Sequence, residues 1–178
     1  KDSILGLSEI APLLSSVPNK KASHQMSNVI IPAQAGRHVA SLIFLHGLGD
    51  SGRGWAPILR MLTRRLPLVR FVLPTAPTRP VTLNGGMQMT AWYDIIGLRE
   101  DAREDEKGIR ESAELVKRLV EEERSNGASL VFVGGFSQGA AVALAATLLH
   151  PEGISGCVAL SGYLPKFLRS SRPVNGPP

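Results

Sequence analysis

Short apolar runs alternate with amphipathic stretches along most of the chain. Four runs are apolar enough to be strands buried on both faces, and they lie at residues 40–45, 70–74, 130–133 and 156–160. Three other stretches carry apolar residues at helical spacing, and they lie at residues 55–66, 104–126 and 140–150. This alternation predicts an α/β fold with a mainly parallel sheet, whose ligands lie beyond the carboxyl ends of the strands.

The two ends of the chain lack such patterns. Residues 1–25 mix Leu and Ile with Ser, Pro and Lys, and we expect them to be an unassigned extension before a native start at Met26. The last residues are rich in Ser and Pro, and we expect 166–178 to be a linker to a missing C-terminal part. The expected core, itself incomplete at its C-terminus, therefore comprises residues 26–165.

Composition and charge narrow the class of protein. The 178 residues are 43% hydrophobic and 20% charged, as in an ordinary globular domain, and no apolar run approaches the ~20 residues of a membrane span. The net charge is +5, but the Arg residues are spread over several elements, which argues against nucleic acid and leaves open a transient contact with an anionic membrane surface. One cysteine, Cys157, forms neither an internal disulfide nor a zinc cage, so we expect a reducing, cytoplasmic compartment. The sequence does not indicate an oligomeric state.

The first glycine-rich motif follows a predicted strand and opens a helix. Residues 47–52 read Gly-Leu-Gly-Asp-Ser-Gly, which has the spacing of a dinucleotide-binding loop. Such a site also needs an acidic residue about 20 positions later to hold the ribose. No Asp or Glu lies between Asp50 and Asp94, and Asp50 itself would repel a pyrophosphate. An oxidoreductase is therefore not favoured.

The second glycine-rich motif is Gly135-Phe-Ser-Gln-Gly139, between a predicted strand and a predicted helix. A sharp strand-to-helix turn lifts its serine hydroxyl above the sheet and points backbone N–H groups at one place. Serine is also a common helix cap, but capping does not require glycine on both sides. The pattern therefore predicts that Ser137 is a nucleophile.

Five segments in order strengthen this interpretation, at residues 45–52, 74–83, 92–98, 134–139 and 161–165. Together they resemble the acyl-protein thioesterase branch of the phospholipase/carboxylesterase family. The resemblance implies a three-layer α/β-hydrolase sandwich that cleaves thioesters and oxyesters, including palmitoyl groups on proteins and lysophospholipids. It also implies that Ser137 is the nucleophile and that the backbone N–H groups of Leu48 and Gln138 form the oxyanion hole.

An acyl chain needs an apolar trough beside this hole. The loop after the strand at 70–74 supplies candidates in Leu83, Trp92, Ile96 and Leu98, and the resemblance adds Tyr163 and Leu164 across the entrance. Acyl transfer through a serine ester requires no metal or cofactor, and no spacing of metal-ligand type occurs. We therefore expect neither.

The general base and its acidic partner are not evident. In this fold they follow the nucleophile, yet only Glu152 and His150 do so here. Thirteen residues of helix place His150 about 20 Å from Ser137. In the family that the chain resembles, His46 belongs to the oxyanion loop. We therefore expect this sequence to lack the triad Asp and His and to be inactive as given.

Three functional hypotheses remain open at this point. The first is an acyl-protein thioesterase or lysophospholipase that acts on an acylated protein or a lysophospholipid. The second is a carboxylesterase of small soluble esters on the same scaffold. Its turnover would not increase with longer acyl chains. The third is a truncated, non-catalytic product that binds lipid or a partner.

Overall fold

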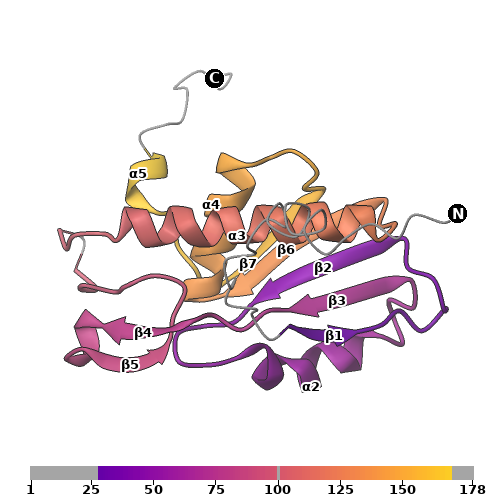
Figure 1. The fold of residues 1–178 in the computed structure, drawn as a ribbon, viewed down its shortest axis with the longest axis horizontal. Coiled ribbons are helices and arrows are strands. Elements are labelled where there is room, and N and C mark those ends of the chain that lie inside the picture. The colour runs from indigo at the N-terminus through magenta and orange to yellow at the C-terminus, as the bar shows by residue number, and fades with distance from the viewer. Residues whose placement is uncertain (1–27, 100, 170–178) are drawn as a thin grey trace, which may run out of the picture.

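The computed structural model describes residues 28–99 and 101–169, and it confirms a mainly parallel sheet (Figure 1). Five strands lie in the order β1-β3-β2-β6-β7, and all neighbours are parallel except β1 and β3. Their bounds are Val29–Ile31 for β1, Ala40–Leu45 for β2, Val69–Leu73 for β3, Leu130–Phe136 for β6 and Gly156–Leu160 for β7. The apolar runs thus became the four parallel strands, with shifts of up to three residues.

Helices cover both faces of the sheet and give three layers (Figure 1). Helix α2 (Gly52–Leu62) packs against β1 and β3, whereas α3 (Glu106–Ser125) and α4 (Gln138–Leu149) lie on the other face. The main core lies under α3 and α4, where α4 is buried from Gln138 to Ala143. No helix among the described residues is both long and apolar enough to cross a membrane.

Helix α2 is shifted relative to the prediction of 55–66. It begins at Gly52 because the hydroxyl of Ser51 accepts a hydrogen bond from the N–H of Gly54 (3.1 Å). It ends at Leu62 and is followed by a turn in which the N–H of Leu66 donates to the carbonyl of Leu62 (2.9 Å). Its buried residues include Ala56 and Leu59, which pack on the sheet, whereas three apolar residues of the predicted face are exposed: Ile58, Leu62 and Leu66.

Several short elements were not predicted. A hairpin of β4 (Thr78–Val81) and β5 (Met87–Thr90) projects beside the carboxyl ends of the strands, and the 3-10 turn η1 (Thr82–Asn84) lies at its tip (Figure 1). Residues 166–169, expected to lie in a linker, form helix α5 (Lys166–Arg169) with Leu168 buried. The extension at 1–25 and the end of the linker, 170–178, lie outside the described residues.

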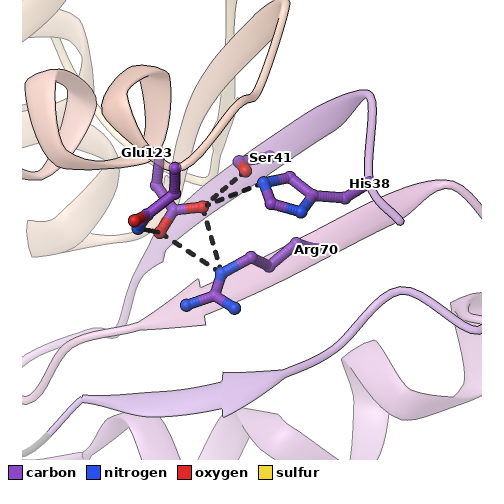
Figure 2. A network of polar contacts seen from close by, with 5 residues as sticks. His38, Ser41, Arg70 and Glu123 are labelled. Atoms are coloured by element: carbon purple, nitrogen blue, oxygen red, sulfur yellow. Dashed lines mark hydrogen bonds and ion pairs between the residues drawn. The ribbon is translucent and has the colours of Figure 1, made fainter. Parts of the chain in front are cut away.

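A buried carboxylate joins three elements at the amino ends of the strands. Glu123 of α3 accepts a hydrogen bond from the hydroxyl of Ser41 on β2 (2.6 Å), and its Oε2 lies 3.1 Å from Nε of Arg70 on β3 (Figure 2). His38 Nε2 lies 3.9 Å from the same oxygen, within ion-pair distance when the imidazole is protonated. The side chain of Glu123 is only 3% exposed. The cluster therefore fixes the end of α3 against the sheet.

We predict that Glu123→Ala lowers the free energy of unfolding by about 3 kcal/mol, because it leaves the Ser41 hydroxyl and the Arg70 guanidinium without their acceptor. Urea unfolding followed by circular dichroism measures the change. The matched control is Glu121→Ala on the same helix, where the side chain is exposed and the effect should stay within about 0.5 kcal/mol. Equal losses in the two variants would contradict the structural role of the cluster.

Candidate active site

Ser137 occupies the sharp turn between β6 and α4. Its backbone has φ 52° and ψ −114°, a conformation that side chains rarely adopt, and its N–H donates to the carbonyl of Leu160 (2.9 Å). Its hydroxyl makes no capping hydrogen bond to α4. The strained turn therefore leaves the oxygen free, as the turn that presents a nucleophile requires.

The two glycines of the motif, Gly135 and Gly139, lie where neighbouring backbone is too close to leave room for a side chain. A Cβ at Gly135 would overlap the backbone of Gly139, and a Cβ at Gly139 would overlap the carbonyl of Leu45. The turn thus brings the start of α4 against the end of β2. This explains the glycines on both sides of Ser137, which a simple helix cap would not need.

The loop at residues 46–51 lies beside this turn. Gly47 faces Phe136 and Ser137, and the N–H of Gly49 donates to the carbonyl of Thr90 (2.8 Å). The hydroxyl of Thr90 donates to the carbonyl of Asp50 (2.6 Å), so the end of β5 holds the loop. In the described part of the chain the N–H of Leu48 has no acceptor. The N–H of Gln138 begins α4, where the first N–H groups of a helix have no intrahelical partner.

The side chain of Gln138 connects the turn to the segment at residues 92–94. Its amide oxygen accepts from the N–H of Trp92 (2.9 Å), and its amide nitrogen donates to the carbonyl of Tyr93 (2.8 Å). The residue is 2% exposed. The hydroxyl of Ser112 on α3 donates to the carbonyl of Trp92 (2.5 Å), so α3 and α4 hold this segment together. Sequence reasoning assigned Gln138 only a backbone role.

His46 is fully buried, and both of its ring nitrogens are engaged. Nε2 accepts from the N–H of Ala76 (2.9 Å), which leaves the proton on Nδ1, where it is donated to the carbonyl of Gly47 (2.6 Å). Burial lowers the pKa of His46, against smaller opposite effects of the Gly47 hydrogen bond and of Asp50. The imidazole therefore stays neutral and fixes the loop, and neither nitrogen is available to Ser137.

A cavity of about 480 Å³ opens next to Ser137 and Gln138. Of the residues predicted to bind an acyl chain, Ile96, Leu98 and Tyr163 line it. Leu83 lies outside it, on the exposed turn η1, and Leu164 packs against the main core. Trp92 is fully buried, and its indole N–H donates to the carbonyl of His46 (2.8 Å), so it supports the loop from behind rather than lining the cavity.

Tyrosine and charged side chains also line this cavity. The hydroxyl groups of Tyr93 and Tyr163 lie 2.6 Å apart, and burial raises the pKa of both phenols. This pair connects the segment at 92–94 to the residues that follow β7. Charged residues cover part of the wall, and they are Asp94, Arg99, Arg103, Glu104, Asp105, Lys166 and Arg169. The sequence analysis did not predict these charged residues.

The described residues do not bring a histidine to Ser137. His150 ends α4, and its Nε2 lies 2.9 Å from a carboxylate oxygen of Glu114. His38 lies in the Glu123 cluster at the amino ends of the strands. In residues 28–99 and 101–169, no three His, Cys, Asp or Glu side chains are grouped so as to hold a metal ion.

Comparisons with known proteins agree with this architecture. Residues 24–173 match the model of the phospholipase/carboxylesterase family. The acyl-protein thioesterase 1 of Yarrowia lipolytica is 47% identical over an alignment of 142 residues, and the match covers 77% of this chain and 62% of that protein. The corresponding protein of Mycosarcoma maydis is 43% identical over 150 residues, with the same shares. The crystal structure of Zea mays acyl-protein thioesterase 2 matches with a TM-score of 0.72 and 38% identity, over 79% of this chain and 63% of that one.

The parallel sheet between helical layers and the strained serine turn at its carboxyl edge define an α/β-hydrolase fold. The chain belongs to the phospholipase/carboxylesterase family, whose members are hydrolases. It spans about 62% of the length of the two curated relatives named above.

We predict that Gln138→Ala lowers the free energy of unfolding by about 3 kcal/mol, because it leaves the N–H of Trp92 and the carbonyl of Tyr93 unpaired in the interior. Chemical denaturation measures this loss. Gln88→Ala on the exposed face of β5 is the control, with an effect within about 0.5 kcal/mol. A loss below about 1 kcal/mol for Gln138→Ala would show that the segment at 92–94 is held by other contacts.

We predict that the free energy of unfolding decreases at acid pH because the buried imidazole of His46 resists protonation. Its pKa is lower in the folded chain than the ordinary value of about 6.5, so the unfolded chain binds the proton more tightly. The contribution is present above about pH 6.5 and is lost as the pH falls toward the folded pKa. The comparison is with His46→Gln, whose amide oxygen can accept from Ala76 but does not titrate. Denaturation at pH 7.5 and 5 should show a larger drop for the unmodified chain, and parallel profiles would contradict this.

Proposed function

We propose that this chain is the nucleophile-bearing part of a serine hydrolase that cleaves long-chain acyl thioesters or esters. Acylated proteins are the favoured substrates, and lysophospholipids are the alternative within the same chemistry. The names of the matching relatives, acyl-protein thioesterases, support this substrate class. The single cysteine, Cys157, is consistent with a reducing, cytoplasmic compartment.

The observation that carries the proposal is the strained conformation of Ser137 beside a loop with a free backbone N–H. In the proposed reaction, Ser137 Oγ attacks the carbonyl carbon of the substrate, and its proton passes to a general base. The N–H groups of Leu48 and Gln138 stabilise the oxyanion of the tetrahedral intermediate. The thiolate or alkoxide leaves with a proton, and water then hydrolyses the acyl-serine ester. No metal or organic cofactor takes part in this scheme.

The acyl chain is proposed to enter the cavity beside Ser137. Ile96, Leu98 and Tyr163 offer apolar surface there, and a volume of about 480 Å³ lies in the range of small-molecule sites. The exposure of Leu98, at 81%, is consistent with a wall that a substrate covers. Trp92 and Leu164 act only indirectly in this proposal, since they shape the surrounding backbone, and Leu83, which lies outside the cavity, takes no part in it.

We further propose that this chain does not supply the base and acid of the triad. Among the described histidines, His46 uses both ring nitrogens, and His150 is paired with Glu114. Without a base the Ser137 hydroxyl stays protonated, and turnover should be about 10⁶-fold below that of a complete enzyme. By itself the chain is therefore nearly inactive.

A chimera tests the proposal. Residues 28–165 of this chain replace the matching part of the Yarrowia lipolytica relative, which supplies the rest of its own length, about 38%. The chimera should hydrolyse a C16 thioester at about 1 to 10 s⁻¹, whereas the 178-residue chain should not. Ser137→Ala should lower the turnover of the chimera by about 10⁶-fold.

The control for this loss is Ser161→Ala, which removes the hydroxyl from the other serine with positive φ, outside the cavity lining. The chimera with Ser161→Ala should keep its turnover within about tenfold of the turnover of the unsubstituted chimera. Two results would overturn the proposal: turnover by the 178-residue chain alone, or an active Ser137→Ala chimera. Equal rates with C16 and acetyl esters would instead favour a carboxylesterase of small esters.

A further inference from the structure

Helix α2 has a second apolar face, which points away from the sheet. Ile58, Met61 and Leu62 follow one another at helical spacing, and they are 52%, 78% and 37% exposed. The opposite face of the helix, with Ala56 and Leu59, is buried. Single exposed apolar residues need no explanation, but a contiguous face does.

The turn after α2 extends this face. Leu66 and Leu68 are 42% and 39% exposed, and the N–H of Leu66 is bonded to the last residue of the helix, Leu62. The loop at 35–39 lies alongside, since Ala35 and Val39 donate to the carbonyls of Pro67 and Leu68. We call these five exposed residues the α2 surface: Ile58, Met61, Leu62, Leu66 and Leu68.

Exposed arginines without acidic partners lie on α2 and on the segments next to the α2 surface. The exposed cations are Arg37, Arg53, Arg60, Arg64 and Arg65. In the described part of the chain none of them lies within 4.0 Å of a carboxylate, and no Asp or Glu occurs between Asp50 and Asp94. Arg60 is favourable near the carboxyl end of the helix dipole, but the dipole does not account for the other four cations on α2 and its neighbouring segments.

We propose that the α2 surface is a docking site for an anionic lipid bilayer. An apolar helix face with a cationic rim lies in the plane of a membrane interface, with the apolar side chains among the acyl chains and the guanidinium groups among the lipid phosphates. Nucleic acid fits less well, because its phosphates offer nothing to the exposed Met61 and Ile58. The site is separate from Ser137, so it stands or falls independently of the hydrolase proposal.

Vesicle co-sedimentation of the full 178-residue chain tests the site. The chain should bind vesicles of phosphatidylcholine with about one third phosphatidylserine, and it should bind pure phosphatidylcholine weakly. Raising the salt from about 0.1 to about 1 M should weaken binding, because the charges are exposed. Arg64→Gln and Arg65→Gln should each weaken the partition coefficient about fivefold, and Met61→Ser about tenfold.

Matched controls lie on the opposite face of the sheet. Arg118→Gln removes an exposed cation from α3, and Leu148→Ser removes a 56% exposed leucine from α4; neither should change vesicle binding. Circular dichroism verifies that each variant is folded. Equal binding to both vesicle types would overturn the proposal, and so would binding that Met61→Ser leaves unchanged, since contact would then be electrostatic adsorption only. A dimer in solution that Met61→Ser dissociates, without effect on vesicles, would assign the surface to a second copy instead.

Discussion

The hydrogen bonds of the Gln138 side-chain amide hold the parts of the candidate active site together. Its two hydrogen bonds join the start of α4 to the backbone of Trp92 and Tyr93. Trp92 in turn supports the carbonyl of His46 at the loop of Leu48, and Tyr93 contacts Tyr163 beyond β7. Because Gln138, Trp92 and Tyr93 are buried, their polar groups need these partners, and losing the Gln138 amide leaves the backbone groups of the other two unsatisfied. The turn of Ser137, the loop at residues 46–51 and the cavity wall are therefore positioned together.

The elements whose signals are local could be predicted from the sequence. Buried parallel strands read as continuous apolar runs, so β2, β3, β6 and β7 were found near their true bounds. The periodic residues Ile109, Ala113, Val116 and Val120 of α3 are all buried. The glycines around Ser137 predicted its turn because their spacing reflects a steric requirement, namely the overlap that any Cβ at 135 or 139 would cause. The sharp turn at Ser137 could therefore be predicted from the sequence, and the structure confirms that turn.

The remaining features depend on contacts between distant residues. The hairpin strands β4 and β5 have only four residues each, β4 carries a proline, and β1 has three residues, so these strands are too short for a reliable pattern. An apolar residue in a loop reads alike whether it is core or cavity wall, which is why Trp92 and Ile96 were grouped although only Ile96 lines the cavity. Periodicity also did not reveal that α2 is apolar on a solvent-facing side.

Hydrogen exchange at one amide tests the central claim that the Gln138 side chain holds the segment at 92–94. The N–H of Trp92 lies in a segment without regular secondary structure, yet it donates to a buried amide oxygen. It should therefore exchange as slowly as the amides of Val131 and Val133 in the central strand β6, through global unfolding. Exchange as fast as at the exposed Leu98 a few residues later would contradict the account, because the cavity wall would then move independently of Ser137.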